Sequence, residues 1–293
     1  MGRVLGVQIS TIMRKQAARI AVLMTCHNRV NVTLHGLWAL ERASQGVDHD
    51  TYLVDDGSTD GTDESIKLKF PLVKIIQGDG KLYWAKGMRL AWEMAAKTGE
   101  YDFYLWLNDD LALKTDAISN ILADYMFVTT NPESPIHSIA PVIVGACADD
   151  ATESTCSYSA TDRADRKIIP NGVPQKADGW LNGNFVLVPK DVYDNIGMIS
   201  GDYTHARADY DYAERLKQYE IPFYCSSRYV GVCHNDFDEK MRSLTLLRRI
   251  KLLWCPGYWN LHDLWLIRRR YHGVWKAILS CMHLILIALK GIK

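Results

Sequence analysis

The chain has 293 residues, 48% of them hydrophobic, which is enough to bury the core of one large domain or of one domain with an appendage. The chain has 34 Lys or Arg residues and 34 Asp or Glu residues, so its net charge is zero. The overall charge therefore indicates neither an anionic nor a cationic partner. The distribution is uneven. Residues 240–293 carry eleven Lys or Arg against one acid, Asp263, so the remainder carries −10.

The first segment, residues 1–19, is expected to be an N-terminal extension. MGRVLGVQIS contains no continuous apolar core and is followed by basic residues, so no secretory signal is expected. None of the seven cysteines forms a CxxC pair, and Cys26 and Cys225 lie in or beside apolar runs. Reduced, buried thiols and a reducing compartment are therefore favoured.

Apolar runs and helical patterns alternate in the next part of the chain. Four runs predict buried strands: IAVLM (20–24), TYLV (51–54), VKII (73–76) and FYLWL (103–107). Helical spacing begins near Asn31, which could cap the helix, and a second amphipathic helix is predicted over 84–99, closed by Gly99. This order predicts an α/β fold with a mostly parallel sheet flanked by helices.

The later part continues this alternation after an interruption. Residues 145–178 are polar and predict a long excursion over the sheet edge, of the kind that often forms a functional lid. Residues 179–197 then predict a strand and a helix that Pro189 opens. Residues 206–225 predict a helix and another strand, which leads to VGVCHND.

Polar clusters follow each of the first four predicted strands. They are Thr25 with His27, Asn28 and Arg29, then Asp55 with Asp56, then Gly78-Asp79-Gly80, and finally Asn108-Asp109-Asp110. In an open α/β sheet, ligands bind at the carboxyl ends of the strands. These clusters are therefore expected to converge on one site.

The segment LWLNDDLAL places two carboxylates, Asp109 and Asp110, at the end of a buried strand. Adjacent carboxylates repel each other and are costly to desolvate. Mg²⁺ or Mn²⁺ would remove this repulsion, because such ions take one or two carboxylates together with phosphate oxygens of a substrate. The alternative is a capping pair for the helix near Thr115.

Three segments in this order resemble the family 2 glycosyltransferases of the GT-A fold: VLMTCHNRVN, TYLVDDGSTDGTDES and LWLNDDLAL. The resemblance extends through GDGKLYWAKGMRLAW, LNGNFVLVPKDVY and ADYDYAERLKQYEIPFY, and covers roughly residues 20–236. It implies a Rossmann-like GT-A domain over residues 20–238. A basic, Trp-rich helical extension would then occupy residues 239–293.

The resemblance also implies roles for the polar residues. Those that would bind the donor nucleotide are Thr25, Asn28, Arg29, Asp55, Asp56 and Asp109. Asp110 would hold Mn²⁺ or Mg²⁺, with His234 as a further ligand. Asn108 stands where the family has an aspartate, which leaves the number of metal ligands open.

The catalytic base of the family corresponds to Asp209, with Asp211 in reserve, because Ala208 replaces the family's glutamate. The alternative for these carboxylates is stabilisation of the helix N-terminus by its dipole, worth roughly 0.3–1 kcal/mol. Four residues are expected to contact donor or acceptor sugar: Trp84, Trp180, Asn182 and Asn184. Core packing is the alternative for both tryptophans.

The implied reaction is a single displacement with inversion at the anomeric carbon, from a UDP- or dTDP-sugar to a saccharide, favouring a lipid-linked one. The segments GDGKLYW and NGNF resemble a subgroup with bacterial rhamnosyl- and other sugar transferases of surface polysaccharide synthesis, such as O-antigen or capsule. A nucleotidyltransferase is disfavoured because TCHNRVN lacks a Gly-rich, basic loop. A catalytically inactive, membrane-associated scaffold is the remaining alternative, supported by Asn108 and Ala208.

The C-terminal apolar run, ILSCMHLILIAL (278–289), is shorter than the roughly 20 residues needed to span a bilayer. Tryptophans and arginines interleave before it, as in helices that lie in the headgroup region. The expectation is a peripheral protein at the cytoplasmic face of the cell membrane, bound to anionic lipid. The alternative is a helical cap on the main domain. Nucleic acid is not expected as a partner, because no recognisable module accompanies the charge.

Overall fold

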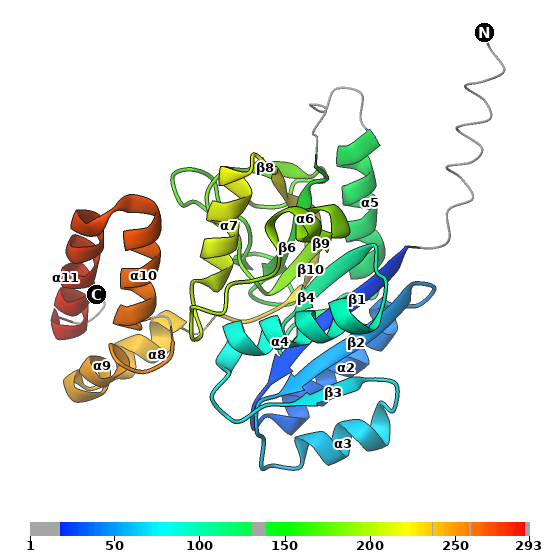
Figure 1. Ribbon diagram of the computed structural model, residues 1–293, viewed down its shortest axis with the longest axis horizontal. Coiled ribbons are helices and arrows are strands. Elements are labelled where there is room, and N and C mark those ends of the chain that lie inside the picture. Colours follow the sequence, from blue (N-terminus) through cyan, green and yellow to red (C-terminus); the bar gives the residue numbers. More distant parts are fainter. Residues whose placement is uncertain (1–17, 131–138, 236, 258, 291–293) are drawn as a thin grey trace, which may run out of the picture.

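A ten-stranded sheet organises the computed structural model, which describes residues 18–130, 139–235, 237–257 and 259–290 (Figure 1). The strands are β1 (Arg19–Cys26), β2 (Asp48–Asp55), β3 (Lys74–Gln77), β4 (Phe103–Leu107), β5 (Ala112–Leu113), β6 (Val142–Ala148), β7 (Cys156–Tyr158), β8 (Gln175–Ala177), β9 (Phe185–Pro189) and β10 (Phe223–Val232). The helices of the same body are α2 (Val30–Ala43), α3 (Thr62–Lys69), α4 (Tyr83–Thr98), α5 (Ala117–Thr130), α6 (Lys190–Ile196) and α7 (Ala208–Gln218).

The strand order is β3-β2-β1-β4-β9-β6-β10-β5, with β7 beside β6 and β8 beside β10. The four strands predicted first are parallel to one another, as expected. The second half is mixed, because β9 runs antiparallel between β4 and β6, while β6 and β10 are parallel. The carboxyl ends of β1, β2 and β4 therefore meet at one edge.

The central strands are continuously apolar because helices cover both faces of the sheet. Alternate residues of β1 enter opposite clusters: Ala21 and Leu23 pack with α4, α6 and α7, while Ile20 and Val22 pack with α2, α3 and α5. Trp92 of α4 is fully buried in the first cluster. Two packed layers thus fix the strand ends that carry the polar residues.

The boundaries of the first four predicted strands agree closely with the observed ones. β4 occupies the predicted residues 103–107, and Gly99 follows α4 as its C-cap. The predicted excursion over residues 145–178 is a correction, because it begins inside the buried strand β6 and contains β7 and β8, which pair with the sheet. A helix cap is a second correction. The suggestion that Asn31 caps α2 is wrong: Asn31 lies inside the first turn and Arg29 is the N-cap residue. The N–H of Val30 is instead bound by the Asp60 carboxylate at 2.9 Å, so a distant loop supplies the cap.

Four further helices follow the sheet: α8 (Phe237–Ser243), α9 (Leu246–Leu252), α10 (Leu261–His272) and α11 (Val274–Lys290). They lie together at one end of the molecule (Figure 1) around their own apolar cluster, which includes Met241, Trp259 and Leu284. Within the described ranges, no helix has both the length and the hydrophobicity required to cross a bilayer.

Side-chain bonds cross the predicted domain boundary at residue 238. Arg270 of α10 binds Asp211 of α7, and Asp263 of α10 binds Thr204. The division into residues 20–238 and 239–293 stays a prediction, and so does the N-terminal extension, of which residues 1–17 lie outside the described residues.

Candidate active site

A cavity of about 1020 Å³ opens at the carboxyl ends of β1 and β4. Of the residues predicted from the sequence to form the site, ten line it: Thr25, Arg29, Asp56, Trp84, Asp109, Asp110, Trp180, Asn182, Asn184 and Asp209. The lining does not include Asn28, Asp55, Asp211 or His234. The expected convergence of the strand ends is therefore present, although four of the candidates lie outside the cavity lining.

The positive charge of Arg29 compensates the repulsion between the adjacent carboxylates Asp109 and Asp110. The guanidinium of Arg29 donates to Asp110 Oδ2 at 2.9 Å and lies 3.4 Å from Asp109 Oδ1. Thr33 donates to Asp109 Oδ2 at 2.8 Å. Burial raises the pKa of Asp109 to about 6, an effect that Arg29 opposes. Asp110 is more exposed and faces the cavity.

Asn108, next to these carboxylates in the chain, links two other residues of the cavity wall through hydrogen bonds. Its Oδ1 accepts a hydrogen bond from the indole N–H of Trp84 at 2.7 Å, and its amide donates to Asn184 Oδ1 at 2.5 Å. Trp84 also lies against Gly183, where an added Cβ would come within 2.4 Å of the ring. Trp84 therefore both lines the cavity and packs against Trp106, and its contact with sugar stays a prediction.

The carboxylate of Asp56 organises the neighbouring loop. Its two oxygens accept backbone N–H bonds from Gly80, Leu82 and Tyr83 at 2.8–2.9 Å. These bonds place Tyr83 in the cavity wall. Asp56 thus shapes the site through the GDGKLYW segment.

Two other nucleotide candidates support the loops behind the cavity. Asn28, with φ of 49°, accepts a hydrogen bond from the backbone N–H of Thr59 at 2.7 Å. Asp55 is fully buried and accepts from the N–H of Ser58 at 3.0 Å. Asn28 thus joins the loop after β1 to the loop after β2, and Asp55 stabilises the loop after β2 internally.

Asp209 stands in the first turn of α7, at the cavity. Its Oδ2 accepts the N–H of Gly183 at 3.2 Å, and its Oδ1 accepts the N–H of Tyr210 at 2.9 Å. Burial raises the pKa of this carboxyl to about 6, and the two N–H groups partly oppose the rise. A carboxylate with such a pKa can take up a proton near neutral pH.

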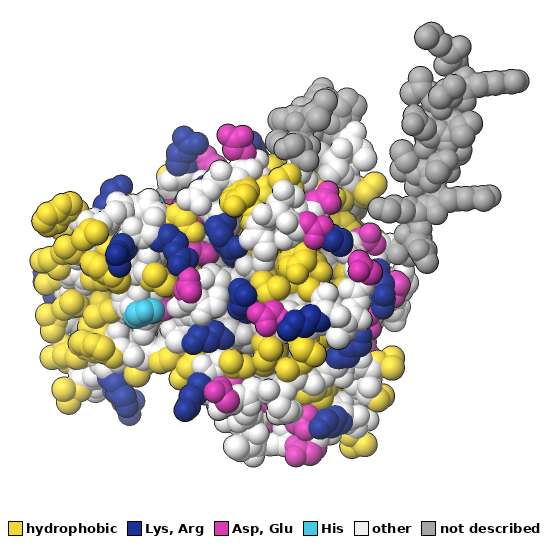
Figure 2. Space-filling model, in the orientation of Figure 1, with side chains coloured by type: hydrophobic (Ala, Val, Ile, Leu, Met, Phe, Trp, Pro, Cys, Tyr) yellow, Lys and Arg dark blue, Asp and Glu magenta, His cyan; other side chains and the backbone are white. Residues whose placement is uncertain are grey.

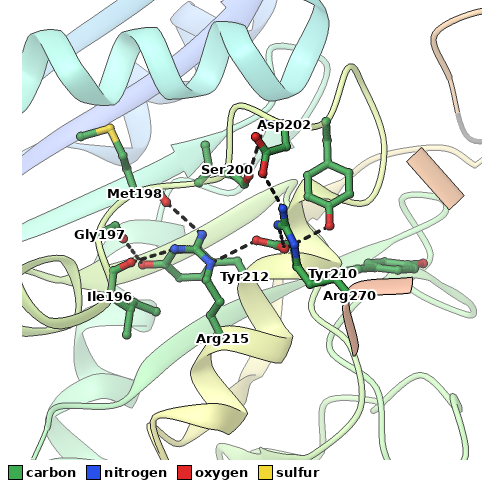
Figure 3. A network of polar contacts seen from close by, with 12 residues as sticks. Ile196, Gly197, Met198, Ser200, Asp202, Tyr210, Tyr212, Arg215 and Arg270 are labelled. Atoms are coloured by element: carbon green, nitrogen blue, oxygen red, sulfur yellow. Dashed lines mark hydrogen bonds and ion pairs between the residues drawn. The ribbon is translucent and has the colours of Figure 1, made fainter. Parts of the chain in front are cut away.

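Asp211 faces the opposite way, as expected for two helical residues that differ by two positions. It is fully buried, outside the cavity. It accepts hydrogen bonds from four donors: Tyr203, Arg215, Arg270 and Tyr271. Arg215 and Arg270 approach this network from two sides (Figure 3). This geometry favours Asp209 over the reserve candidate.

Trp180 forms part of an aromatic platform. Its ring stacks on Tyr210 at 5.0 Å with an interplanar angle of 23°, and its indole N–H donates to Asp165 at 2.6 Å. Asn182, which accepts the N–H of Asn184 at 3.1 Å, lies in the same cavity wall. An aromatic face with nearby amides suits the apolar face and hydroxyls of a sugar ring.

His234 pairs with a different carboxylate and does not line the cavity. His234 Nδ1 lies 3.2 Å from Asp149, and the thiol of the preceding Cys233 lies 3.8 Å from Asp110 Oδ1. Among the described residues, no three His, Cys, Asp or Glu side chains gather into a group that could hold a metal. Asp109 and Asp110 still fit a hard cation that draws its other ligands from a diphosphate and water.

Several cavity residues had no role in the sequence analysis. The polar excursion contributes Ser157, Ser159, Thr161 and Lys167, and the region around α7 contributes His205 and Tyr210. The C-terminal region contributes Met241 of α8, Leu252 of α9 and Trp259, which precedes α10. The excursion was marked by its composition. The C-terminal residues carried no local signal for this site, since only the folded chain brings them to the cavity that Asp209 also lines.

Comparison with known proteins agrees with this geometry. Residues 21–126 match the family model described as Glycosyl transferase family 2. No curated protein sequence matches the chain. A solved mannosyltransferase, PcManGT from Pyrobaculum calidifontis in complex with GDP-Man and Mn²⁺, is similar over 99% of this chain and 83% of its own, with 11% identity and a TM-score of 0.55.

Solved structures of S. aureus TarS are also similar. TarS residues 1–349 in complex with UDP align with 86% of this chain and 71% of their own, at 16% identity and a TM-score of 0.53. In another TarS structure, the aligned part makes up 86% of this chain but only 42% of the TarS chain, at 15% identity and a TM-score of 0.52. The GT-A fold is confirmed, and the family 2 match over residues 21–126 supports a glycosyltransferase.

Proposed function

We propose that the protein is a metal-dependent, inverting glycosyltransferase that moves a sugar from a nucleotide-diphospho-sugar to a saccharide acceptor. The observation that carries this proposal is the presence of Asp209 in one cavity with Asp109 and Asp110. A fourth carboxylate of the lining, Asp56, is occupied by three backbone N–H groups. Asp209 is therefore the best base of this cavity, and a single base favours direct displacement.

In the proposed mechanism, Asp209 accepts the proton of an acceptor hydroxyl as that oxygen attacks the anomeric carbon. Asp110, with Asp109, would hold Mn²⁺ or Mg²⁺, which supplies positive charge beside the leaving diphosphate. Trp180 and Asn182 orient a sugar, and the hydrogen bond from Gly183 keeps the base directed into the cavity. Inversion follows because no covalent intermediate with the enzyme is required.

The donor that we propose carries UDP or dTDP, and the acceptor is lipid-linked. The solved neighbours hold UDP or GDP-Man in their own structures, which supports the nucleotide-sugar class. The segments GDGKLYW and NGNF support a hexosyl- or deoxyhexosyltransferase of O-antigen or capsule synthesis, through their resemblance to bacterial rhamnosyl- and other sugar transferases. Both segments contribute side chains to the cavity, Tyr83 and Trp84 from the first and Asn184 from the second.

The test is a thermal-shift panel with UDP, GDP, dTDP and CMP, each with and without Mn²⁺ or Mg²⁺. One nucleoside diphosphate is expected to raise the melting temperature in a metal-dependent way, because a ligand at a hundredfold its Kd stabilises the fold by about 2.7 kcal/mol. Transfer from the corresponding donor would then be followed, with the product anomer read by NMR. If no nucleotide shifts the melting temperature, the inactive scaffold becomes the better reading.

We also propose that the protein binds the cytoplasmic face of the cell membrane peripherally, through α9, α11 and the segment between α9 and α10. Large apolar side chains are exposed there: Leu247 at 80%, Trp254 at 68%, Trp275 at 78%, Leu279 at 63% and Met282 at 54%. Hydrophobic and basic side chains gather together over this end (Figure 2). Asp263, the one acid after residue 239, is fully buried, so the surface charge here is basic.

Replacing Trp254 and Trp275 together with serine is expected to weaken binding to vesicles of anionic lipid by more than tenfold. Each exposed indole would lose an apolar contact of roughly 2 kcal/mol with the bilayer. Co-sedimentation with vesicles containing and lacking phosphatidylserine measures the change. The matched control is Trp38→Ser, which removes an exposed tryptophan of α2. Equal binding by the double variant and the control would refute the proposed surface.

A further inference from the structure

The helix α10 contacts the loop that leads into the proposed catalytic base. The carboxylate of Asp263 accepts the N–H and the hydroxyl of Thr204, with closest distances of 3.1 and 2.9 Å, and the N–H of His205 at 3.4 Å. Asp263 is itself oriented by the cap of α10, since its N–H donates to Asn260 Oδ1 at 2.9 Å. The loop is thus fastened five residues before Asp209.

A second fastening lies just beyond the base. Arg270 bridges two carboxylates, donating to Asp202 at 2.5 Å and to Asp211 at 2.8 Å (Figure 3). Tyr271 adds a hydrogen bond to the same Asp211 oxygen at 2.9 Å. Asp211 is fully buried, and without these two donors it would keep only the bonds from Tyr203 and Arg215 and would lose its link to α10.

The backbone between the two fastenings is not in a relaxed conformation. Arg207 has φ of 73°, in the left-handed region that residues other than glycine rarely adopt. Such strain persists only where the surroundings hold the chain. Asp209 is bonded to the backbone N–H groups of Gly183 and Tyr210, so the direction of its carboxylate depends on where this first turn of α7 lies.

We infer that Asp263 and Arg270 of α10 are positioning residues for Asp209. They hold residues 202–211 without lining the cavity themselves, and without them the base loses its fixed direction toward the acceptor hydroxyl. The inference rests on the proposed role of Asp209. It also makes α10 part of the catalytic unit, with α11 packed on α10 in turn.

The test compares Arg270→Ala and Arg270→Lys with Arg269→Ala, which removes the neighbouring exposed arginine. Both Arg270 variants are expected to lower kcat by about ten- to a hundredfold at an unchanged KM for the donor, because a misplaced base affects the chemical step. Lysine keeps the charge but cannot reproduce the two-carboxylate bridge of the guanidinium. Arg269→Ala should retain the wild-type kcat. Equal kcat in all three variants would overturn the inference.

Amide hydrogen exchange provides a readout that is independent of transfer activity. In Arg270→Ala, the amides of residues 202–211 should exchange faster, while those of β1 and β4 keep their protection. Tyr271→Phe removes one donor to Asp211 without changing the core. The same exchange measurement is made on this variant if Arg270→Ala does not fold. Unchanged exchange over 202–211 in the variant that folds would refute the positioning role. If the wild type transfers no sugar, the proposed function fails, and the exchange result still decides this inference.

Discussion

Replacing Asp209 with asparagine is expected to lower kcat by about 10²–10⁴-fold, which is the usual contribution of a positioned general base. Asparagine keeps the shape, and its one oxygen can accept the N–H of Gly183 while the bond from the N–H of Tyr210 is lost, so the cavity should persist. The affinity for the donor nucleotide should not change, because Asp209 is assigned to the acceptor proton. Initial rates at saturating donor, with a thermal-shift titration of the nucleotide, measure the two effects.

The pH dependence gives this prediction a second arm. The pKa of Asp209 is about 6, so the ionised base predominates above pH 6 and is lost as the pH falls through that value. The wild-type rate should therefore decline on the acid side with an apparent pKa near 6. The residual rate of Asp209→Asn should lose the part of this limb that belongs to Asp209 and keep only the part due to Asp109, whose pKa burial also raises to about 6. Asp194→Asn, which removes an exposed carboxylate paired with Lys190, is the control. A wild-type kcat in Asp209→Asn would exclude Asp209 from the mechanism.

Much of the fold could be predicted because its signals are local. The run FYLWL is apolar throughout and is covered on both faces, so its limits in the sequence are also those of β4. The convergence of Thr25, Asp56 and Asp109 was predictable for a related reason. Parallel strands place their carboxyl ends at one edge, whatever the loops do.

The roles of several loop residues could not be predicted, because their partners are distant in the chain. Asp56 is bound by N–H groups 24–27 residues away, and Asp211 by side chains of α10 some 60 residues away. No local pattern reports such pairings. Helical geometry does separate Asp209 from Asp211, since residues two apart lie on different faces. That spacing predicts that only one of the two faces the cavity, and the cavity lining shows that it is Asp209.

The replacement Asp110→Ala is expected to abolish the metal-dependent part of nucleotide binding. With nucleotide at a hundredfold its wild-type Kd, the stabilisation of about 2.7 kcal/mol should fall to the level seen without metal. The stability of the free protein should change little, because Asp110 is partly exposed and such ion pairs are worth about 0–1 kcal/mol. Thermal unfolding with and without Mn²⁺ measures both quantities.

A variant of Arg29, which pairs with Asp110, distinguishes the loss of a metal ligand from the loss of a charge. Arg29 already compensates Asp110 in the protein, so a bound cation would have to share this carboxylate with the guanidinium. Arg29→Gln should therefore leave the metal dependence in place, or strengthen it, while Asp110→Ala removes it. If Asp110→Ala still shows a metal-dependent shift, the cation does not depend on this carboxylate, and Asp110 acts instead as the partner that fixes Arg29 beside the nucleotide.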